Sequence, residues 1–132
     1  MLLSLFSLVA TVHVAAQPGT GTWKNTTLDN ENVTGSETSL AIDSHDYPHI
    51  SYFESGSPGN DKLRYAWQDA GGWHNTTVIS SGVAGEQTSL ALDGNGYAHI
   101  SYVSTSNYKT LMYAWQDAAG WHNTTIDSAG DE

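Results

Sequence analysis

Short apolar runs separated by turn-forming residues succeed one another along this chain. In the first complete unit the runs fall at residues 39–43, 48–53, 63–68 and 73–79, with stretches rich in Gly, Asp, Asn and Ser between them. Runs of this length that contain aromatic and β-branched residues and are bounded by such breakers predict β-strands. The 3.6-residue period of an amphipathic helix is missing. The pattern therefore predicts four short strands and no helix.

The four-strand unit occurs twice. Ser-Leu-Ala-Ile-Asp at 39–43 returns as Ser-Leu-Ala-Leu-Asp at 89–93, His-Ile-Ser-Tyr at 49–52 returns at 99–102, and Tyr-Ala-Trp-Gln-Asp-Ala at 65–70 returns at 113–118. A repeat of about 40–50 residues built from four antiparallel strands is typical of a β-propeller blade. The sequence thus predicts an all-β fold with two complete blades, at residues 38–80 and 88–127.

Residues 22–29 repeat only the fourth strand of this unit. They contain Trp-Lys-Asn-Thr-Thr, which matches Trp-His-Asn-Thr-Thr at 73–77 and 121–125. Because propellers need about four to eight blades, we expect residues 17–132 to be a fragment of a larger ring, with a lone outer strand at 22–29. Two blades alone leave an uncovered face at each end, so we expect contacts with the remaining blades of the same protein, or self-assembly.

The first residues have the features of a signal peptide. An apolar run at 2–10 precedes Val-Ala-Ala at 14–16, and small residues before the mature start are what signal peptidase accepts. The run is too short to cross a bilayer core of about 30 Å. We therefore predict a signal peptide at 1–16 and an exported mature chain at 17–132, without a membrane span, at the cell surface or outside the cell. The alternative is that the segment stays uncleaved as an anchor at the membrane surface.

Composition narrows the possible partners. The chain has 14 acidic and 4 basic residues and a net charge of −10, which argues against binding to nucleic acid, because phosphate binding needs a basic surface. It has no cysteine. An exported chain of this kind is therefore stabilised by packing rather than by disulfides.

The repeated motifs resemble those of a known family. Ser-Leu-Ala-Ile-Asp at 39–43, Pro-His-Ile-Ser-Tyr at 48–52 and Leu-Arg-Tyr-Ala at 63–66 are similar to the "SLALD…PHISY…LKYA" blades of secreted archaeal and bacterial β-propeller repeat proteins. These look like distant relatives of the sialidase-type, Asp-box propellers. The resemblance covers nearly all of residues 22–128 and implies an exported ring of six or seven blades. The match to an Asp box itself is poor, because Trp73 and Trp121 come one residue too early, so sialidase chemistry does not carry over.

Four tryptophans are candidate ligand-binding residues. Trp67 and Trp73 return as Trp115 and Trp121. Aromatic faces bind sugar rings by apolar contact when a polar side chain nearby fixes the hydroxyls. The alternative, which the blade pattern favours, is that these rings fill the space between blades.

Four asparagines are candidate glycosylation sites. Asn25, Asn32, Asn75 and Asn123 each begin an Asn-x-Thr sequon, which is an acceptor in exported chains. Three of them belong to one repeated motif. Polar packing of an outer strand explains that motif equally well.

We predict no metal and no cofactor. His49 and His99 are equivalent, but each blade supplies only one, and a ring would hold them far apart compared with metal–nitrogen bonds of about 2 Å. We expect each to hydrogen-bond to a neighbouring strand. The segments that begin at Asp43 and Asp93 fit hairpin turns better than calcium loops, because no bidentate Glu follows at loop spacing.

The sequence carries no recognisable catalytic set. A sialidase-type site needs several arginines, and Arg64 is the only one in the chain. We therefore expect a scaffold that binds a protein or another ligand, without catalysis in these blades. Two alternatives remain open. One is a carbohydrate-binding, lectin-like propeller that uses the repeated tryptophans, and the other is a sialidase-like glycoside hydrolase or lyase whose active site lies in blades outside this chain.

Overall fold

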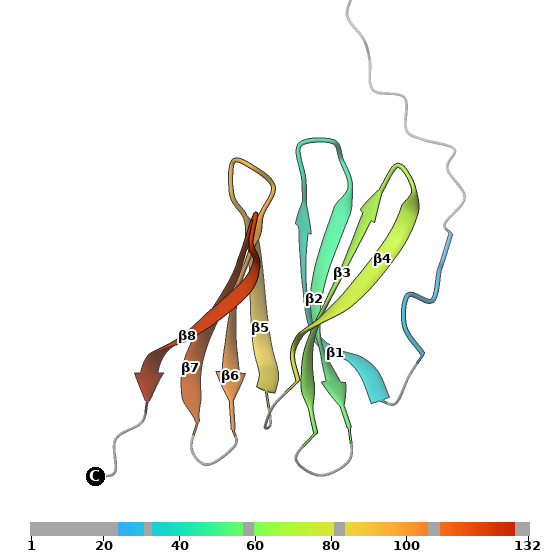
Figure 1. Cartoon of the computed structure of the whole chain (residues 1–132). Helices are drawn as coiled ribbons and strands as arrows, with labels where there is room; N and C mark the ends of the chain where they lie inside the picture. The colour runs from blue at the N-terminus through green and yellow to red at the C-terminus, as the bar shows by residue number, and fades with distance from the viewer. Residues whose placement is uncertain (1–23, 31–32, 57–59, 81–83, 106–108, 129–132) are drawn as a thin grey trace, which may run out of the picture.

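The computed structural model describes residues 24–30, 33–56, 60–80, 84–105 and 109–128. These residues form eight β-strands and no helix (Figure 1). The strands are β1 (Val33–Ile42), β2 (Pro48–Ser55), β3 (Lys62–Asp69), β4 (Gly72–Ile79), β5 (Ala84–Leu92), β6 (Ala98–Ser104), β7 (Thr110–Asp117) and β8 (Gly120–Ser128). No helix in this part of the chain is long and apolar enough to cross a membrane.

Each half of the chain forms one four-stranded antiparallel sheet. The strand order is β1-β2-β3-β4 in the first sheet, called sheet 1 here, and β5-β6-β7-β8 in the second, sheet 2. The turns that join β1 to β2, β3 to β4 and β5 to β6 lie at one end of the sheets, and strands β2 and β6 end at the other (Figure 1). The prediction of an all-β fold with two four-stranded, blade-like units is confirmed.

The first strand of each sheet begins earlier than the sequence predicted. Pairing between β1 and β2 continues back to Val33, through register shifts on both sides of Ser36. The backbone there passes through positive φ at Gly35 and Glu37, and sheet 2 repeats this geometry. Bulges of this kind let a strand stay paired while it bends. The apolar pattern stops where the bulges begin, which is why the prediction started the strands late.

The two sides of each sheet differ, because alternate residues of a strand point to opposite faces. We call the side that carries Ser51 in sheet 1, or its counterpart Ser101 in sheet 2, the serine face. The other side carries Ile50, or its counterpart Ile100, and we call it the isoleucine face. Each sheet therefore has one face of each kind.

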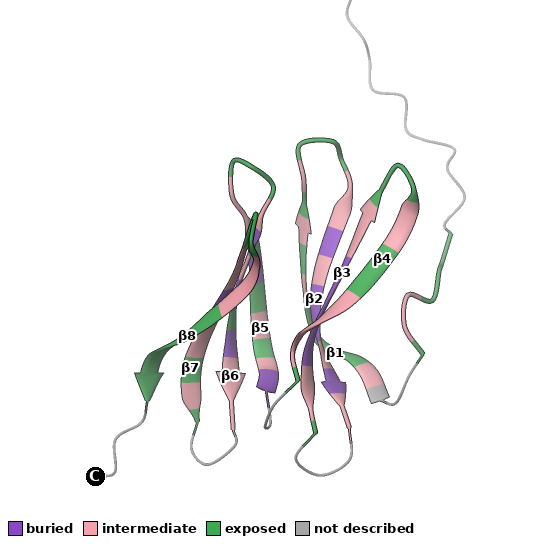
Figure 2. Cartoon of the chain, in the orientation of Figure 1, coloured by how far each residue is buried: buried purple, intermediate pink, exposed green. Residues whose placement is uncertain are grey.

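The serine face of sheet 1 packs on the isoleucine face of sheet 2. The Ser51 hydroxyl donates to Thr88 Oγ1 at 2.9 Å, and the Leu90 amide donates to Ser39 Oγ at 3.0 Å. The buried apolar core lies between these faces (Figure 2) and consists of Leu63, Tyr65, Ala84, Leu90, Ala98, Ile100, Tyr102 and Ala114. The sheets thus pack head to tail, with unlike faces of the same unit in contact.

The bulge of β5 comes very close to sheet 1. A Cβ atom added to Gly85, whose φ is +106°, would lie 2.9 Å from the Leu63 Cα atom, whereas a Cβ on the equivalent Gly35 would meet nothing within 4 Å. Both glycines have a positive φ, which strains any other residue.

Substitution of these two glycines should separate backbone strain from sheet packing. Gly85→Ala should lower the free energy of unfolding by about 1–3 kcal/mol more than Gly35→Ala, because only Gly85→Ala forces two backbones apart. Urea unfolding of both variants measures the difference. Equal losses would mean that the sheets do not pack at this distance.

The segment at residues 24–30 runs alongside sheet 1 (Figure 1). The strand predicted at 22–29 is not formed by residues 24–29, and residues 22–23 lie outside the described part, as does the predicted signal peptide. The Asn75 side chain donates to the Leu28 carbonyl at 3.2 Å, and Thr34 Oγ1 donates to the Asp29 carbonyl at 3.3 Å. The segment lies over a face of sheet 1 and not beside a strand edge, so it does not pair with a strand there.

Candidate functional site

Each sheet carries a row of stacked rings on its serine face. In sheet 1, Tyr65 stacks on Trp67 with ring centroids 5.5 Å apart, and Trp67 stacks on His74 at 5.1 Å. His49 Nδ1 and the Tyr65 hydroxyl share a hydrogen bond of 2.5 Å, and burial raises the pKa of Tyr65. Sheet 2 repeats the row with His99, Tyr113, Trp115 and His122. The expected hydrogen bond from each repeated histidine to a neighbouring strand is confirmed.

These rows affect how the four candidate tryptophans could bind a ligand. Trp67 and Trp115 each stack against two rings of their own sheet, so their faces contact protein rather than solvent. Trp121 packs edge-on against Tyr65 of the other sheet, at 5.2 Å. Trp73 is the counterpart of Trp121 on the isoleucine face of sheet 1 and is half-buried. Stacking within sheet 1 and packing against the core account for Trp67, and packing between the sheets accounts for Trp121. Ligand binding by these residues stays a prediction.

A cavity of about 250 Å³ opens between the sheets, which we call the junction pocket. Sheet 1 lines it with His49, Tyr65 and Trp67, and sheet 2 lines it with Asn95, Gly96, Tyr97 and Gln116. His49 is 7 % exposed, and its Nε2 atom has no hydrogen-bond partner among the described residues, although Asp43 Oδ2 lies 3.7 Å away. The pocket therefore combines an indole side chain with polar groups of both sheets, a combination that suits a small polar ligand.

The aspartates at the β1–β2 and β5–β6 turns hold the backbone of those turns. Asp43 Oδ1 accepts hydrogen bonds from the amides of His45 and Tyr47, both at 2.8 Å. The bond from Tyr47 is the main reason why the pKa of Asp43 is lowered. Asp93 makes the equivalent bonds in sheet 2. These segments form the expected turns. In the described part of the chain no group of three or more His, Cys, Asp or Glu residues could hold a metal ion.

Sheet 1 has a buried cluster of charges that sequence reasoning missed. Arg64 contacts Asp29 Oδ2 at 3.0 Å and Glu54 Oε2 at 3.4 Å, and Lys62 contacts Glu54 Oε1 at 2.7 Å. The Tyr52 hydroxyl donates to Asp29 Oδ2 at 2.9 Å. We call these five residues the ionic cluster.

Burial and charge shift the pKa values within the ionic cluster. Burial raises the pKa of Tyr52 to about 12. Burial by itself lowers the pKa of Arg64, but the hydrogen bond to Tyr52 and the charges of Asp29 and Glu54 outweigh it, so that the pKa is raised. The tyrosine is therefore neutral and the arginine charged at physiological pH.

A comparison of the two repeats would have located the ionic cluster. Sheet 2 has Ser104, Thr110 and Met112 where sheet 1 has Glu54, Lys62 and Arg64. These differences stand out because the surrounding motifs are nearly identical. Because buried charges need partners, charges that are buried in only one of the two repeats indicate that this repeat packs against a different segment there.

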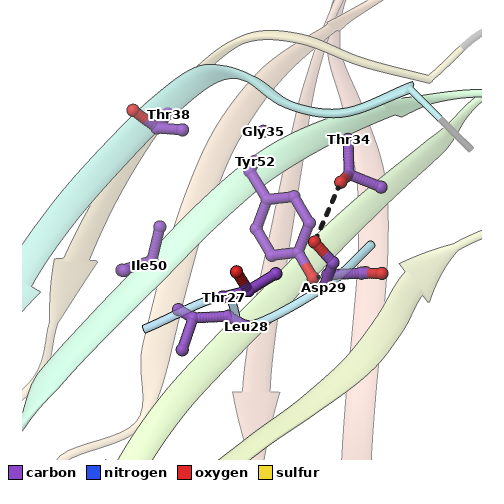
Figure 3. A pocket seen from close by; sticks show the side chains of 8 residues that line it. All are labelled: Thr27, Leu28, Asp29, Thr34, Gly35, Thr38, Ile50 and Tyr52. Carbon is purple, nitrogen blue, oxygen red and sulfur yellow. Dashed lines mark hydrogen bonds between the residues drawn. The ribbon is translucent and has the colours of Figure 1, made fainter. Parts of the chain in front are cut away.

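A second cavity, of about 220 Å³, lies beside the ionic cluster on the isoleucine face of sheet 1. Figure 3 shows the Tyr52 ring extending toward Asp29, with Leu28 and Ile50 to its left in this view. Thr27, Thr34, Gly35 and Thr38 complete the lining. On sheet 2 the equivalent face is covered by sheet 1. The cavity is therefore the part of this face that the segment at residues 24–30 leaves open.

The four sequons lie in different surroundings. Asn25 and Asn123 are exposed, and Asn32 lies outside the described residues. Asn75 is also exposed, but its side-chain nitrogen donates to the Leu28 carbonyl and its oxygen accepts from Arg64. Glycosylation of any of them stays a prediction.

Comparisons with known proteins give no family assignment. No protein-family model and no curated protein sequence matches this chain. Its function is therefore argued from its own residues.

Proposed function

We propose that this chain is part of an exported β-propeller, similar to the secreted archaeal and bacterial propeller repeats, and that its blades act as a binding scaffold without catalysis. The observation that supports this most is the head-to-tail contact between the sheets. The serine face of sheet 1 packs on the isoleucine face of sheet 2. The outer side of sheet 1 is its isoleucine face, and the outer side of sheet 2 is its serine face. Repetition of one such contact generates a ring when the rotation closes.

A catalytic role in these blades has little support. Arg64 is the only arginine in the chain, and its guanidinium is occupied by Asp29, Glu54 and Thr77. It is therefore not available to bind a substrate carboxylate. A hydrolase or lyase activity would depend on residues outside this chain, and no contact of the described residues favours it.

Binding of a small polar ligand, such as a sugar, has one specific observation in its favour. The junction pocket is lined by His49, whose buried Nε2 atom has no hydrogen-bond partner among the described residues, and by Trp67 and Gln116. Each pair of adjacent blades would form one such pocket. A repeated weak site of this kind suits multivalent binding to a surface that carries many copies of the ligand.

Titration with a panel of mono- and oligosaccharides, followed by tryptophan fluorescence, tests ligand binding. Gln116→Ala should weaken the response about tenfold, since it removes hydrogen bonds worth about 1.4 kcal/mol. Gln68→Ala is the matched control at protein concentrations where the chain is monomeric, because Gln68 is the counterpart of Gln116 on sheet 1 and does not line this pocket within one copy. No response with the unmodified chain, or equal loss in both variants, would contradict sugar binding at the junction pocket.

Export is tested independently of binding. N-terminal sequencing of the secreted protein should give a mature start at Gln17, because Val-Ala-Ala precedes it. An intact Met1 in a soluble cytoplasmic pool would contradict export.

A further inference from the structure

The two outer faces of the pair expose residues whose counterparts are buried between the sheets. Leu40, on the isoleucine face of sheet 1, is 62 % exposed, whereas its counterpart Leu90 is 9 % exposed. Leu111, on the serine face of sheet 2, is 43 % exposed, whereas its counterpart Leu63 is completely buried. Each end of the structure thus carries one half of the contact that the chain makes internally.

The polar groups of the internal contact are also repeated at the ends. Inside the chain, Thr88 Oγ1 donates to the Glu37 carbonyl at 2.8 Å and accepts from Ser51 Oγ, and the Leu90 amide donates to Ser39 Oγ. Every one of these side-chain groups has a counterpart of the same type: Ser89 and Ser101 on sheet 2, and Thr38 on sheet 1. Gly35 has the same positive-φ bulge as Gly85, although a Cβ atom added to it would meet nothing within 4 Å. The ends therefore offer matching hydrogen-bond partners as well as matching shapes.

The end of β8 carries a charge that fits sheet 1. In the repeat, Asp127 corresponds to Asp29 and to Ile79. Asp29 bonds to Arg64 on sheet 1, whereas Ile79 packs against the core at sheet 2, where Met112 replaces the arginine. The aspartate of this position is thus found with an arginine on the facing sheet, and the isoleucine is found with a methionine. By this rule Asp127 matches Arg64.

We propose that copies of this chain associate head to tail, with the serine face of sheet 2 in one copy on the isoleucine face of sheet 1 in the next. Ile126 and Asp127 of the first copy then replace Leu28 and Asp29 on Arg64 of the second. Such a heterologous contact continues from copy to copy until a ring closes. This association does not depend on the sugar proposal, because the junction pocket lies within one copy.

Two lysine substitutions at exposed positions test the direction of the contact. Leu111→Lys disables the serine face of sheet 2, and Leu40→Lys disables the isoleucine face of sheet 1. Size-exclusion chromatography with light scattering should show oligomers for the unmodified chain and monomers for each variant. An equimolar mixture of the two variants should form a dimer and nothing larger, since only one intact contact remains. Ala70→Lys, at an exposed turn, is the control and should assemble normally.

Each outcome decides the proposal. A chain that stays monomeric at all accessible concentrations would overturn it, and so would a mixture of the variants that remains monomeric. Oligomers formed by Leu111→Lys or Leu40→Lys alone would show that another surface is used. Circular dichroism melts establish that each variant is folded, which we expect because both leucines are exposed in the single copy.

The two equivalent aspartates should have opposite effects on assembly. Asp127→Ala should raise the midpoint concentration of assembly about tenfold, because a charge-assisted hydrogen bond to Arg64 is lost. Asp29→Ala should lower that midpoint, because Asp29 holds the segment that competes for the same place. A role of Asp29 in folding alone would not strengthen association. If both variants shifted the midpoint concentration in the same direction, Asp127 of one copy would not replace Asp29 of the next, and the proposal would be overturned.

Discussion

Replacement of Arg64 by Met should lower the free energy of unfolding by about 3–5 kcal/mol. The Arg64 side chain is 10 % exposed and lies between the carboxylates of Asp29, 6 % exposed, and Glu54, completely buried. Methionine fills a similar volume but supplies no charge. Two buried carboxylates then lose their arginine partner in a region of low dielectric, which costs far more than the loss of a surface ion pair. Urea unfolding followed by circular dichroism measures the change.

Sheet 2 supplies the control for this experiment. A variant that combines Arg64→Met with Glu54→Ser and Lys62→Thr carries the residues that the second repeat has at these three positions, and Asp29→Ile adds the residue type that Ile79 presents to sheet 2. It should regain most of the stability lost by Arg64→Met, because the buried charges are removed together. A loss below about 1 kcal/mol for Arg64→Met alone, as for an exposed ion pair, would show that the ionic cluster is open to solvent.

Leu63→Ala should lower the free energy of unfolding by about 2–5 kcal/mol, the usual range for a completely buried leucine. Leu63 sits between the two sheets, against the bulge at Gly85. Truncation removes its buried methyl groups and leaves a cavity that the two rigid sheets cannot close.

Leu111→Ala is the matched control for Leu63→Ala. Leu111 holds the same position in the second repeat but is 43 % exposed. Its truncation should therefore change stability by only about 0.5 kcal/mol. Both measurements belong at a low protein concentration, where association of copies makes no contribution. Equal losses for the two variants would contradict the packing of sheet 1 on sheet 2.

The periodic part of the fold could be predicted from the sequence because each strand is specified locally. The apolar run at 39–43 and the Asp43 turn need only their own residues and the alternation of a strand to define a hairpin. The same holds for the aromatic rows, since Tyr65 and Trp67 are two residues apart and therefore share a face. The early start of β1 could not be predicted in this way. Its pairing depends on positive φ at Gly35 and Glu37, which no apolar pattern records.

The candidate site was harder to predict, because its parts come from segments that are distant in sequence. Trp67 was selected as a ring that could bind a sugar, yet the cavity beside it is completed by Asn95 and Gln116 of the other sheet. Asp29 and Arg64 lie 35 residues apart. They gave no motif of their own, and only the loss of charge at Ser104, Thr110 and Met112 in the second repeat marked the place.

The sequence by itself determined that this protein is built from two copies of one four-stranded antiparallel unit, since strand length, alternation and turn chemistry act over a few residues. The tertiary structure decided which face of one unit contacts which face of the next. It also decided that Leu63 is buried while Leu111 is exposed, although the two positions are equivalent in the repeat. Burial depends on what lies across a face, and across the packed faces of this protein the neighbour is a part of the chain that is distant in sequence.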